Sequence, residues 1–387
     1  MADRGCLLIA DITGYTAYLN ESELEHAQDS LASLIRLLIT HTRPPLAISR
    51  LEGDAVISYA IDGSFIQGQL LVDMIEETYV SFQQALEGMV MNTTCTCNAC
   101  RNIGGLDLKF FVHHGEFVRQ SLGGHDELVG RDVNIVHRLT KNTVTSVTGM
   151  RAYTLYTRQT VEALGLQDFA ATLTPHREAY PDVGELDVVV QDMAPVWQQA
   201  RERVRQRVTP EQAVLSIDMR LPLPPALAWD YISNPRYRAV IVGSDSAAVS
   251  GRNAGRISEG TVYICAHGKS SYEHTVVDWH PFDEVTVRAQ SPLPGTDGLY
   301  TISLAPDGEG TLATVTLGPS RGPFLFRTLD TLASKVMGKR MLAKGTVNFI
   351  RLIEKDIADG VVVLPTPAPD PATEAIAAAA RESLAGG

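Results

Sequence analysis

The hydrophobic pattern changes at a polar segment, residues 194–212, that carries four arginines: Arg201, Arg203, Arg205 and Arg207. Before it, stretches with helical spacing alternate with short apolar runs, and after it many strand-like runs lead to one long helical stretch. At roughly 150 residues per domain, 387 residues are enough for two domains with separate cores. The pattern predicts one domain over residues 1–193, a helical linker over 194–212 and a second domain over 213–360. Residues 361–387, rich in Pro and Ala, are expected to be a mobile or weakly helical tail.

Local periodicity predicts an α+β fold for the first domain, with helices covering an antiparallel or mixed sheet. Helices are predicted over residues 21–40, 66–89 and 130–142, and strands over 6–11, 46–51, 55–60, 106–114, 117–122 and 188–191. The second domain is predicted to have a strand over 214–221, a helix over 225–233, about six strands over 240–317 and one helix over 323–357.

Composition excludes several classes of protein. The formal net charge of −12 argues against broad nucleic-acid binding, which needs a basic surface. The sequence has no run of about 18 apolar residues, which predicts no membrane span. Asp11 interrupts the only early apolar stretch, so no signal peptide is predicted. Five cysteines do not suggest a disulfide framework, and we expect a reduced, cytoplasmic protein.

Two carboxylates follow short apolar strands in the first half. Asp11 ends a predicted strand before a turn at Gly14 and a helix, and Asp54 lies at a hairpin tip after Gly53. Backbone N–H groups at such a turn can bind phosphate, and two carboxylates on adjacent strand ends can hold two divalent ions. Taken singly, each residue favours a structural interpretation, with Asp11 as a helix cap and Asp54 as part of a turn.

A third motif opens the helix that follows Gly130. Asn134 and Arg138 are four residues apart and therefore share one helical face. An amide beside a guanidinium can orient a ribose and neutralise a phosphorus transition state. Alone, this pair is also typical of a solvated helix face.

Together these motifs resemble the class III nucleotidyl cyclases, the catalytic domain of adenylate and guanylate cyclases, over about residues 5–192. That family has a strand ending in Asp-Ile-x-Gly-Phe-Thr, a Gly-Asp hairpin, a His-x-Gly-like segment and Gly-x-x-Val-Asn-x-x-x-Arg. Here these motifs are Asp11-Ile12-Thr13-Gly14-Tyr15-Thr16, Gly53-Asp54, His113-His114-Gly115, and the segment that begins at Gly130 and includes Asn134 and Arg138. The resemblance implies a ferredoxin-like α+β fold.

The resemblance also implies roles for these residues. Asp11, Asp54 and the Ile12 carbonyl would bind two Mg²⁺ or Mn²⁺ ions, with the turn Thr13, Gly14, Tyr15, Thr16 at the substrate. Asn134 would position the ribose, and Arg138 would stabilise the α-phosphate. In this family one domain supplies the metal carboxylates and another supplies the Asn and Arg, so one such domain per chain implies a head-to-tail homodimer.

At the positions where the family reads the base, this chain has Arg50 and Glu127. Arg offers only donors and an ionised Glu only acceptors, which matches the adenine edge and favours ATP over GTP. CTP stays open, since cytosine presents the same order of donor and acceptor. The family's triphosphate lysine has no counterpart in residues 180–186, and Arg177 is the nearest cation.

Cys95, Cys97 and Cys100 form a C-x-C-x2-C cluster. Clustered thiolates suit zinc or an iron–sulfur centre, with a fourth ligand from Cys6, a histidine such as His113, or a second copy of the chain. Three free thiols in a loop fit the spacing equally well. If a metal binds, a structural zinc is favoured.

The second domain resembles the START-like polyketide cyclase and lipid-transport (SRPBCC) superfamily, whose helix-grip fold wraps a sheet around a long helix. The match rests on the order of elements, with residues 223–232 as its first helix. It implies an apolar cavity for a hydrophobic molecule. The stripe Phe324, Leu325, Leu329, Leu332, Val336 and Met341 is expected either to line that cavity or to fill the core.

Two functions follow from these patterns. The first is an adenylate cyclase-type lyase that makes 3′,5′-cyclic AMP and pyrophosphate from ATP, regulated by a hydrophobic ligand of the second domain. The alternative is a weak or inactive cyclase-like platform that senses nucleotide or dimerises, fused to a lipid- or polyketide-binding domain. The metal-binding, Asn and Arg positions favour the enzyme, and the missing lysine favours the alternative.

Overall fold

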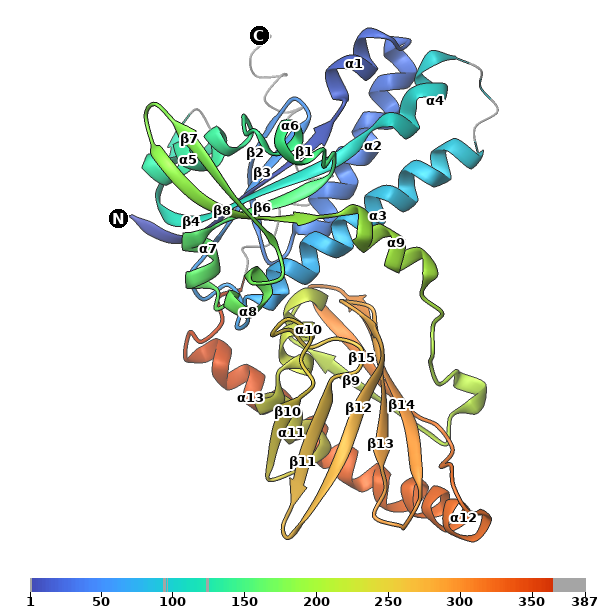
Figure 1. Ribbon diagram of the computed structural model, residues 1–387. Coiled ribbons are helices and arrows are strands. Elements are labelled where there is room, and N and C mark those ends of the chain that lie inside the picture. The colour runs from blue at the N-terminus through green and yellow to red at the C-terminus, as the bar shows by residue number, and fades with distance from the viewer. Residues whose placement is uncertain (1, 93–94, 96, 123–124, 365–387) are drawn as a thin grey trace, which may run out of the picture.

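The structure is a computed structural model that describes residues 2–92, 95, 97–122 and 125–364 (Figure 1). Most of the predicted tail, residues 365–387, lies outside the described residues, as does the side chain of Val336. Two bodies of α+β structure sit one above the other in Figure 1, joined along one side by the linker. The predicted α+β class is confirmed for both.

The N-terminal domain is built on an eight-stranded mixed sheet. Its strands are β1 (Asp3–Thr13), β2 (Ala47–Glu52), β3 (Ala55–Ile61), β4 (Asp107–Leu122), β5 (His125–Val129), β6 (Tyr153–Thr157), β7 (Thr174–Tyr180) and β8 (Gly184–Asp192). The order is β2-β3-β1-β4-β6-β8-β7, β5 pairs with β4, and only the β4–β6 pair is parallel. The helices are α1 (Tyr15–Asn20), α2 (Leu24–Thr42), α3 (Gln69–Asn92), α4 (Asn98–Asn102), α5 (Arg131–Leu139), α6 (Val144–Thr148), α7 (Arg158–Ala163), α8 (Gln167–Ala170) and α9 (Ala194–Glu202), with a 3-10 turn η1 (Ile103–Gly105).

Strand β1 divides this domain into two cores because successive side chains of a strand point to opposite faces. Leu8 and Ala10 pack into the core beneath α2 and α3, whereas Leu7 and Ile9 pack into the core beneath α5. Asp11 continues the second set, so its carboxylate lies on the α5 face of the sheet. The alternation places the candidate metal residue on the same face as the helix that carries Asn134 and Arg138.

The C-terminal domain is a seven-stranded antiparallel sheet around a long helix. Its strands are β9 (Leu215–Leu221), β10 (Ser246–Ser250), β11 (Val262–His267), β12 (Ser270–His280), β13 (Glu284–Gln290), β14 (Asp297–Asp307) and β15 (Gly310–Leu317), in the order β10-β11-β12-β13-β14-β15-β9. Its helices are α10 (Pro225–Ser233), α11 (Pro235–Val242), α12 (Phe324–Ala333) and α13 (Lys339–Ala358). A π-helical turn, η3 (Ser334–Gly338), joins α12 to α13, so the helix predicted over residues 323–357 is continuous but locally overwide.

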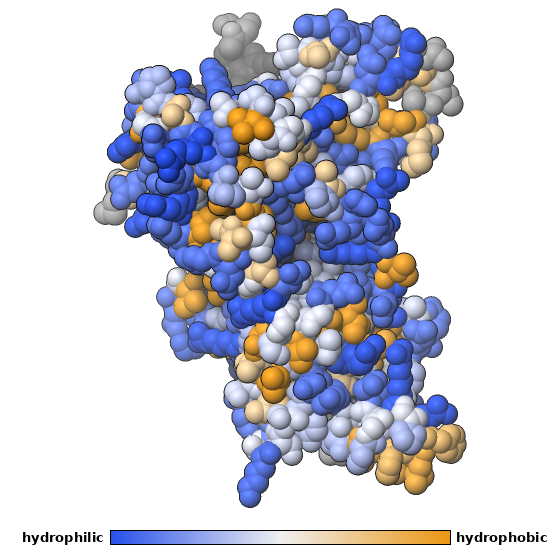
Figure 2. Space-filling view, viewed as in Figure 1, coloured by the Kyte–Doolittle hydropathy of each residue, from blue (hydrophilic) through white to orange (hydrophobic). Residues whose placement is uncertain are grey.

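The predicted core stripe on this helix is wrong for its first part. Phe324, Leu325, Leu329 and Leu332 are between 50% and 73% exposed, and Figure 2 shows apolar side chains at the far end of the domain, where α12 lies. Farther along the helix, Leu342, Phe349 and Ile353 are buried in the core of the domain, and Met341 lines a cavity. Helical periodicity identifies an apolar face, but it does not say which part of a helix extends past the sheet.

A polar junction joins the two domains. Asp230 of α10 accepts hydrogen bonds from the backbone N–H of Ile66 at 2.5 Å and from Gln67 Nε2 at 2.9 Å. Arg256 pairs with Glu76 of α3 at 3.0 Å and stacks over the ring of Phe169. The described end of the chain also returns to the first domain, since the Val363 N–H donates to the Gly63 carbonyl at 2.9 Å.

The linker is helical only over its first part. Helix α9 covers residues 194–202, residues 203–209 are irregular, and a short turn, η2 (Pro210–Gln212), precedes β9. Arg203 donates to the Trp279 carbonyl at 3.1 Å, and Arg205 pairs with Asp283 at 2.8 Å. The linker arginines therefore hold the chain against the β12–β13 hairpin.

Candidate functional site

Asp11 and Asp54 lie together at one end of the sheet. Asp11 pairs across β1–β3 with Ala55, and the Ile12 N–H donates to the Asp54 carbonyl at 3.2 Å. Burial and the nearby Asp54 raise the pKa of Asp11 to about 6, and burial raises the pKa of Asp54. Two partly buried carboxylates that repel each other are a donor set that fits a divalent cation, which would remove that repulsion.

The turn after β1 is set by Gly14. Its φ of +90° is a left-handed conformation that glycine adopts without strain, and it starts α1. The Thr13 hydroxyl is buried and has no hydrogen-bond partner within the described structure. Tyr15 and Thr16 form the first turn of α1. The turn thus holds an unused polar group beside the carboxylate pair.

Lys109 is a further charged residue near the pair, and the sequence analysis missed it. It lies opposite Asp11 in the β1–β4 ladder, and its charge partly offsets the rise in the pKa of Asp11. Its own pKa is lowered by burial. The strand register could have revealed it, because Asp11 and Lys109 are opposite one another once β1 and β4 are paired.

The His-His-Gly segment of β4 docks the start of α5. A Cβ on Gly115 would lie 2.2 Å from the Asp132 carboxylate, so only glycine allows this close approach. Asp132 accepts from the Glu116 N–H at 2.6 Å and lies 3.3 Å from the ring of His113. These contacts fix the orientation of α5 and therefore of its exposed face.

That face opens into a cleft of about 490 Å³. Both predicted residues of α5 line it, together with several that the sequence analysis did not select; the lining residues are Glu52, Arg131, Asn134, His137, Arg138, Thr140, Lys141, Asp182 and Val183. Arg138 pairs with Asp182 at 2.5 Å and is 46% exposed. Arg131, Arg138 and Lys141 give the cleft three cations against the carboxylates of Glu52 and Asp182, an excess of positive charge that suits an anionic ligand.

Arg50 and Glu127 come together at the same face from β2 and β5. Their charged groups lie 3.9 Å apart, and Arg50 also pairs with Glu52 at 2.5 Å. His137 of α5 lies 3.4 Å from Arg50, and burial lowers the pKa of this histidine. A donor and an acceptor side by side at a cleft can read the edge of a base.

Arg177 lies elsewhere. It is on β7, 62% exposed, and pairs with Asp187 at 2.9 Å and Glu185 at 3.3 Å. It is not among the residues that line the α5 cleft, where Arg131 and Lys141 are the additional cations. Neither Asp11 nor Asp54 lines that cleft either. One chain therefore presents two separate groups, the carboxylate pair and the α5 cleft.

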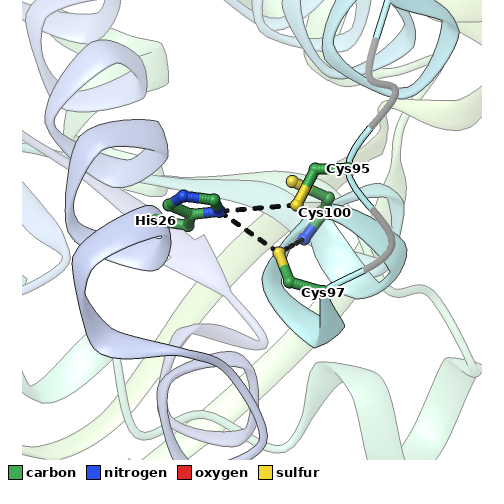
Figure 3. Close-up of side chains that lie close together, drawn as sticks. All are labelled: His26, Cys95, Cys97 and Cys100. Carbon is green, nitrogen blue, oxygen red and sulfur yellow. Dashed lines mark hydrogen bonds between the residues drawn. The ribbon is translucent and has the colours of Figure 1, made fainter.

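The cysteine cluster gathers beside α2 (Figure 3). Cys97 Sγ lies 3.3 Å and Cys95 Sγ 3.7 Å from Nδ1 of His26, and the ligand atoms of these residues and Cys100 all lie within 4.8 Å of one another. Hydrogen bonds from Cys97 lower the pKa of the Cys95 thiol. The fourth residue is thus His26. The alternatives Cys6 and His113 are buried in β1 and β4, where burial raises the pKa of Cys6 to about 12 and His113 contacts Thr157.

The C-terminal domain has an apolar cavity of about 410 Å³ between the sheet, α11 and the α12–α13 helix. Ile241, Ile302 and Leu342 are among its apolar lining residues, and Arg238, His267 and His274 add polar groups. Cys265 is buried.

Residues 31–148 match a family described as "Protein of unknown function (DUF2652)", and residues 212–354 match the family "Polyketide cyclase / dehydrase and lipid transport". The second match, together with the sheet around α13, confirms the predicted helix-grip domain. An uncharacterized protein of Mycobacterium tuberculosis (strain ATCC 25618 / H37Rv) is 28% identical over 155 residues, which are 39% of this chain and 70% of that protein.

The solved structures similar to this chain include nucleotidyl cyclases. A bacterial light-regulated adenylyl cyclase matches with a TM-score of 0.37 and 14% identity over 52% of this chain, which spans 57% of that chain. The adenylyl cyclase CyaB from P. aeruginosa matches with a TM-score of 0.35 and 14% identity, over 50% of this chain and 95% of that chain. The guanylyl cyclase Cya2 matches with a TM-score of 0.35 and 14% identity, over 49% of this chain and 92% of that chain. At these TM-scores the similarities carry no argument about activity.

Among the described residues, no helix combines the length and the apolar character needed to cross a membrane.

Proposed function

We propose that the N-terminal domain is a metal-dependent nucleotidyl cyclase that favours ATP. The observation that carries the proposal is the presence, on one chain, of two complementary groups. Asp11 and Asp54 form a carboxylate pair, while Asn134 and Arg138 line a cationic cleft beside Arg50 and Glu127.

The carboxylate pair would hold two Mg²⁺ or Mn²⁺ ions, with the Ile12 carbonyl as a further ligand. Such ions, when bound, lower the pKa of a ribose hydroxyl and neutralise phosphate charge. The unpartnered Thr13 hydroxyl supports a polar ligand at this turn, since a buried hydroxyl without a partner is costly.

The α5 cleft would bind and orient the nucleotide. The reaction joins the ribose 3′-oxygen to the α-phosphorus and releases pyrophosphate. Arg138 would stabilise charge on the α-phosphate, and Asn134 would hold the ribose. Arg131 and Lys141 line the same cleft and are better placed than Arg177, which two carboxylates engage, to bind the remaining phosphates.

The proposal requires a head-to-tail homodimer. Because the carboxylate pair does not line the cleft within one chain, the cleft of one copy would face the pair of a second copy. Each dimer would then hold two sites.

The C-terminal domain is proposed to bind a hydrophobic molecule that regulates the cyclase. Its cavity supports this role, since a volume of about 410 Å³ is within the usual range for small-molecule sites. The junction of Asp230 with Gln67 and of Arg256 with Glu76 gives a direct route between the domains.

The test incubates the purified full chain with Mn²⁺ and each of ATP, GTP, CTP and UTP, and measures 3′,5′-cyclic products by mass spectrometry. We expect cyclic AMP as the main product, lost in Asp54→Asn and retained in Glu309→Gln, which changes an exposed carboxylate of the C-terminal domain. If nucleotides bind but no cyclic product forms from any of the four, the domain is a nucleotide sensor instead. Full activity in Asp54→Asn would refute the two-metal proposal.

A further inference from the structure

The best-defined metal site in the described residues lies outside the proposed nucleotide site. We propose that His26, Cys95, Cys97 and Cys100 bind one structural zinc ion. Cys95 and Cys97 precede α4, Cys100 lies within α4, and His26 comes from the first turns of α2. The ligands therefore reach the site from two sides (Figure 3).

The distances fit a tetrahedral ion. With Zn–S of ~2.3 Å and Zn–N of ~2.0 Å, neighbouring ligand atoms are about 3.5–3.8 Å apart. His26 Nδ1 lies 3.3 Å from Cys97 Sγ and 3.7 Å from Cys95 Sγ, and all four ligand atoms lie within 4.8 Å of one another. Three thiolates and an imidazole favour zinc over the oxygen-loving Mg²⁺ and Ca²⁺. Four protein ligands close the coordination sphere, which is typical of a structural site.

The surrounding contacts hold the ligands in place without the ion. The Cys100 N–H donates to Cys97 Sγ at 3.4 Å, so Cys97 also caps α4. The Glu23 carboxylate accepts from the Ala99 N–H at 3.1 Å, which ties the start of α4 to the start of α2. The site is therefore largely preformed, and ion binding would replace thiol protons.

The zinc ion would stabilise the structure that packs against the turn at Gly14, which follows Asp11. Helix α4 leads through η1 to Leu106, and a Cβ on Gly14 would lie 3.5 Å from the Gly105 carbonyl and 3.7 Å from the Leu106 side chain. Fixing α4 to α2 thus supports the packing behind Gly14, three residues after Asp11.

The test measures metal in full-length chain purified without chelator and then reconstituted with Zn²⁺ under reducing conditions. We expect about one zinc per chain. With Co²⁺ in its place, we expect the visible bands of a tetrahedral ion and a thiolate charge-transfer band. His26→Ala should lose most of the zinc, and His26→Cys should regain it as a four-thiolate site.

Two controls and three outcomes make the test decisive. Asp29→Asn, which changes an exposed carboxylate of α2 one turn after His26, and Cys265→Ala, in the other domain, should both keep the ion. Less than a fifth of an equivalent after reconstitution, on the order of background binding, overturns the proposal. Iron with acid-labile sulfide overturns it in favour of a cluster, and full zinc in His26→Ala overturns the ligand set. If the variants do not fold, the cobalt spectrum of the wild-type protein still tests the proposal.

A second, independent observation concerns the cavity of the C-terminal domain. We infer that this cavity takes an apolar molecule with a carboxylate group, which Arg238 recognises. Arg238 lines the cavity, is 1% exposed, and stacks 4.2 Å over the ring of Tyr263. The inference rests on the proposed binding of a hydrophobic molecule and specifies its class.

Arg238 carries a buried charge that has no counter-ion among the described residues. Its Nη2 donates to the Tyr300 hydroxyl, its Nε has no hydrogen-bond partner, and no carboxylate of the described residues forms an ion pair with it. Asp330 also lines the cavity but accepts from Ser320 at 2.6 Å and from Ser291. Burial and the charge of Arg238 lower the pKa of His274 to about 3, so that ring is neutral. An isolated buried guanidinium is costly, and a ligand anion would offset that cost.

The test compares dodecanoate with 1-dodecanol on the full chain, by calorimetry and by the shift in melting temperature. We expect the acid to bind about 10–100-fold tighter than the alcohol, as for a hydrogen-bonded charge. Arg238→Met should remove this preference, and Arg220→Met, an exposed arginine on β9, should keep it.

The outcomes separate the inference from the proposal beneath it. Equal affinity for acid and alcohol in the wild type, or an unchanged preference in a folded Arg238→Met, overturns the role of Arg238 alone. If neither compound binds, the proposed hydrophobic ligand fails as well. If Arg238→Met does not fold, the comparison of dodecanoate with 1-dodecanol in the wild-type protein still tests the inference.

Discussion

Arg138 and Arg238 show how the two domains differ. Arg138 is 46% exposed on a cleft with other cations and pairs with an exposed aspartate, whereas Arg238 is 1% exposed in an apolar cavity without a carboxylate partner among the described residues. The α5 cleft is proposed to bind a triphosphate together with a second copy of the chain. The apolar cavity lies within one chain, and its proposed ligand would be selected by apolar volume and one charge. The proposed catalysis therefore depends on assembly, and the proposed ligand binding does not.

The largest expected effect on the proposed catalysis comes from a change in the carboxylate pair. Asp54→Asn should lower cyclic-nucleotide formation by at least about 10³-fold, because a neutral amide cannot offset the charge of two divalent ions. The rate of product formation by mass spectrometry measures this loss. The melting temperature should not fall, since the change also removes repulsion with Asp11. A rate within tenfold of wild type would contradict the pair's role.

The two halves of the long helix allow a matched test of packing. Phe349→Ala on α13 should lower the free energy of unfolding by about 3–5 kcal/mol, because Phe349 is fully buried. Phe324→Ala on α12 should change it by less than about 0.5 kcal/mol, since Phe324 is 73% exposed. Urea unfolding followed by circular dichroism measures both. Similar losses in the two variants would mean that the apolar face of α12 is covered in solution.

A third test asks whether the α5 cleft of one copy works with the carboxylate pair of another. Arg138→Ala should lower turnover by about 10²–10³-fold, the usual cost of losing a transition-state charge partner. Mixed with inactive Asp54→Asn, it should recover part of the activity, because one site of the mixed dimer has both intact halves. Titration of one variant against the other measures the recovery. No recovery despite exchange of subunits would place the carboxylate pair and Arg138 in one chain.

The sequence predicted those features that depend on local pattern. Asp11, Asp54, Asn134 and Arg138 lie in short motifs, and the structure places the first two together and the last two on one cleft. His26 was not predicted, because it is 69 residues before Cys95 and only the packing of α2 against α4 brings them together. The short strand β6 is fully buried and lacks alternation, and the exposed, polar β7 lacks an apolar face, so periodicity revealed neither.

The junction between the domains should respond to pH through Asp230. Burial raises the pKa of Asp230 from 3.8 to about 6 despite hydrogen bonds from Gln67 and Ile66. The folded state thus favours the protonated carboxyl of Asp230. Its contribution to the free energy of unfolding is fully present below pH 3.8, the pKa in the unfolded chain, and is lost as the pH rises through about 6, the pKa in the folded chain. Relative to Asp230→Asn, the free energy of unfolding should fall by about 2 kcal/mol between about pH 4 and about pH 7. Parallel pH profiles for the two proteins would show that Asp230 does not titrate there.

The smallest expected effect concerns the exposed partner of Arg138. Asp182→Asn removes the carboxylate that lies 2.5 Å from the guanidinium, so a phosphate no longer competes with it. Both side chains are exposed, and exposed ion pairs contribute about 0–1 kcal/mol, so the KM for ATP should fall by at most about fivefold. The free energy of unfolding should change by less than about 1 kcal/mol for the same reason. Glu185→Gln, which alters the equally exposed partner of Arg177, is the matched control and should leave the KM unchanged. A fall in KM with Glu185→Gln but not with Asp182→Asn would mean that the triphosphate binds at the β7–β8 hairpin and not in the α5 cleft. Arg138 would then have no role in binding the nucleotide, and the comparison of exposed Arg138 with buried Arg238 would no longer be one of two ligand sites.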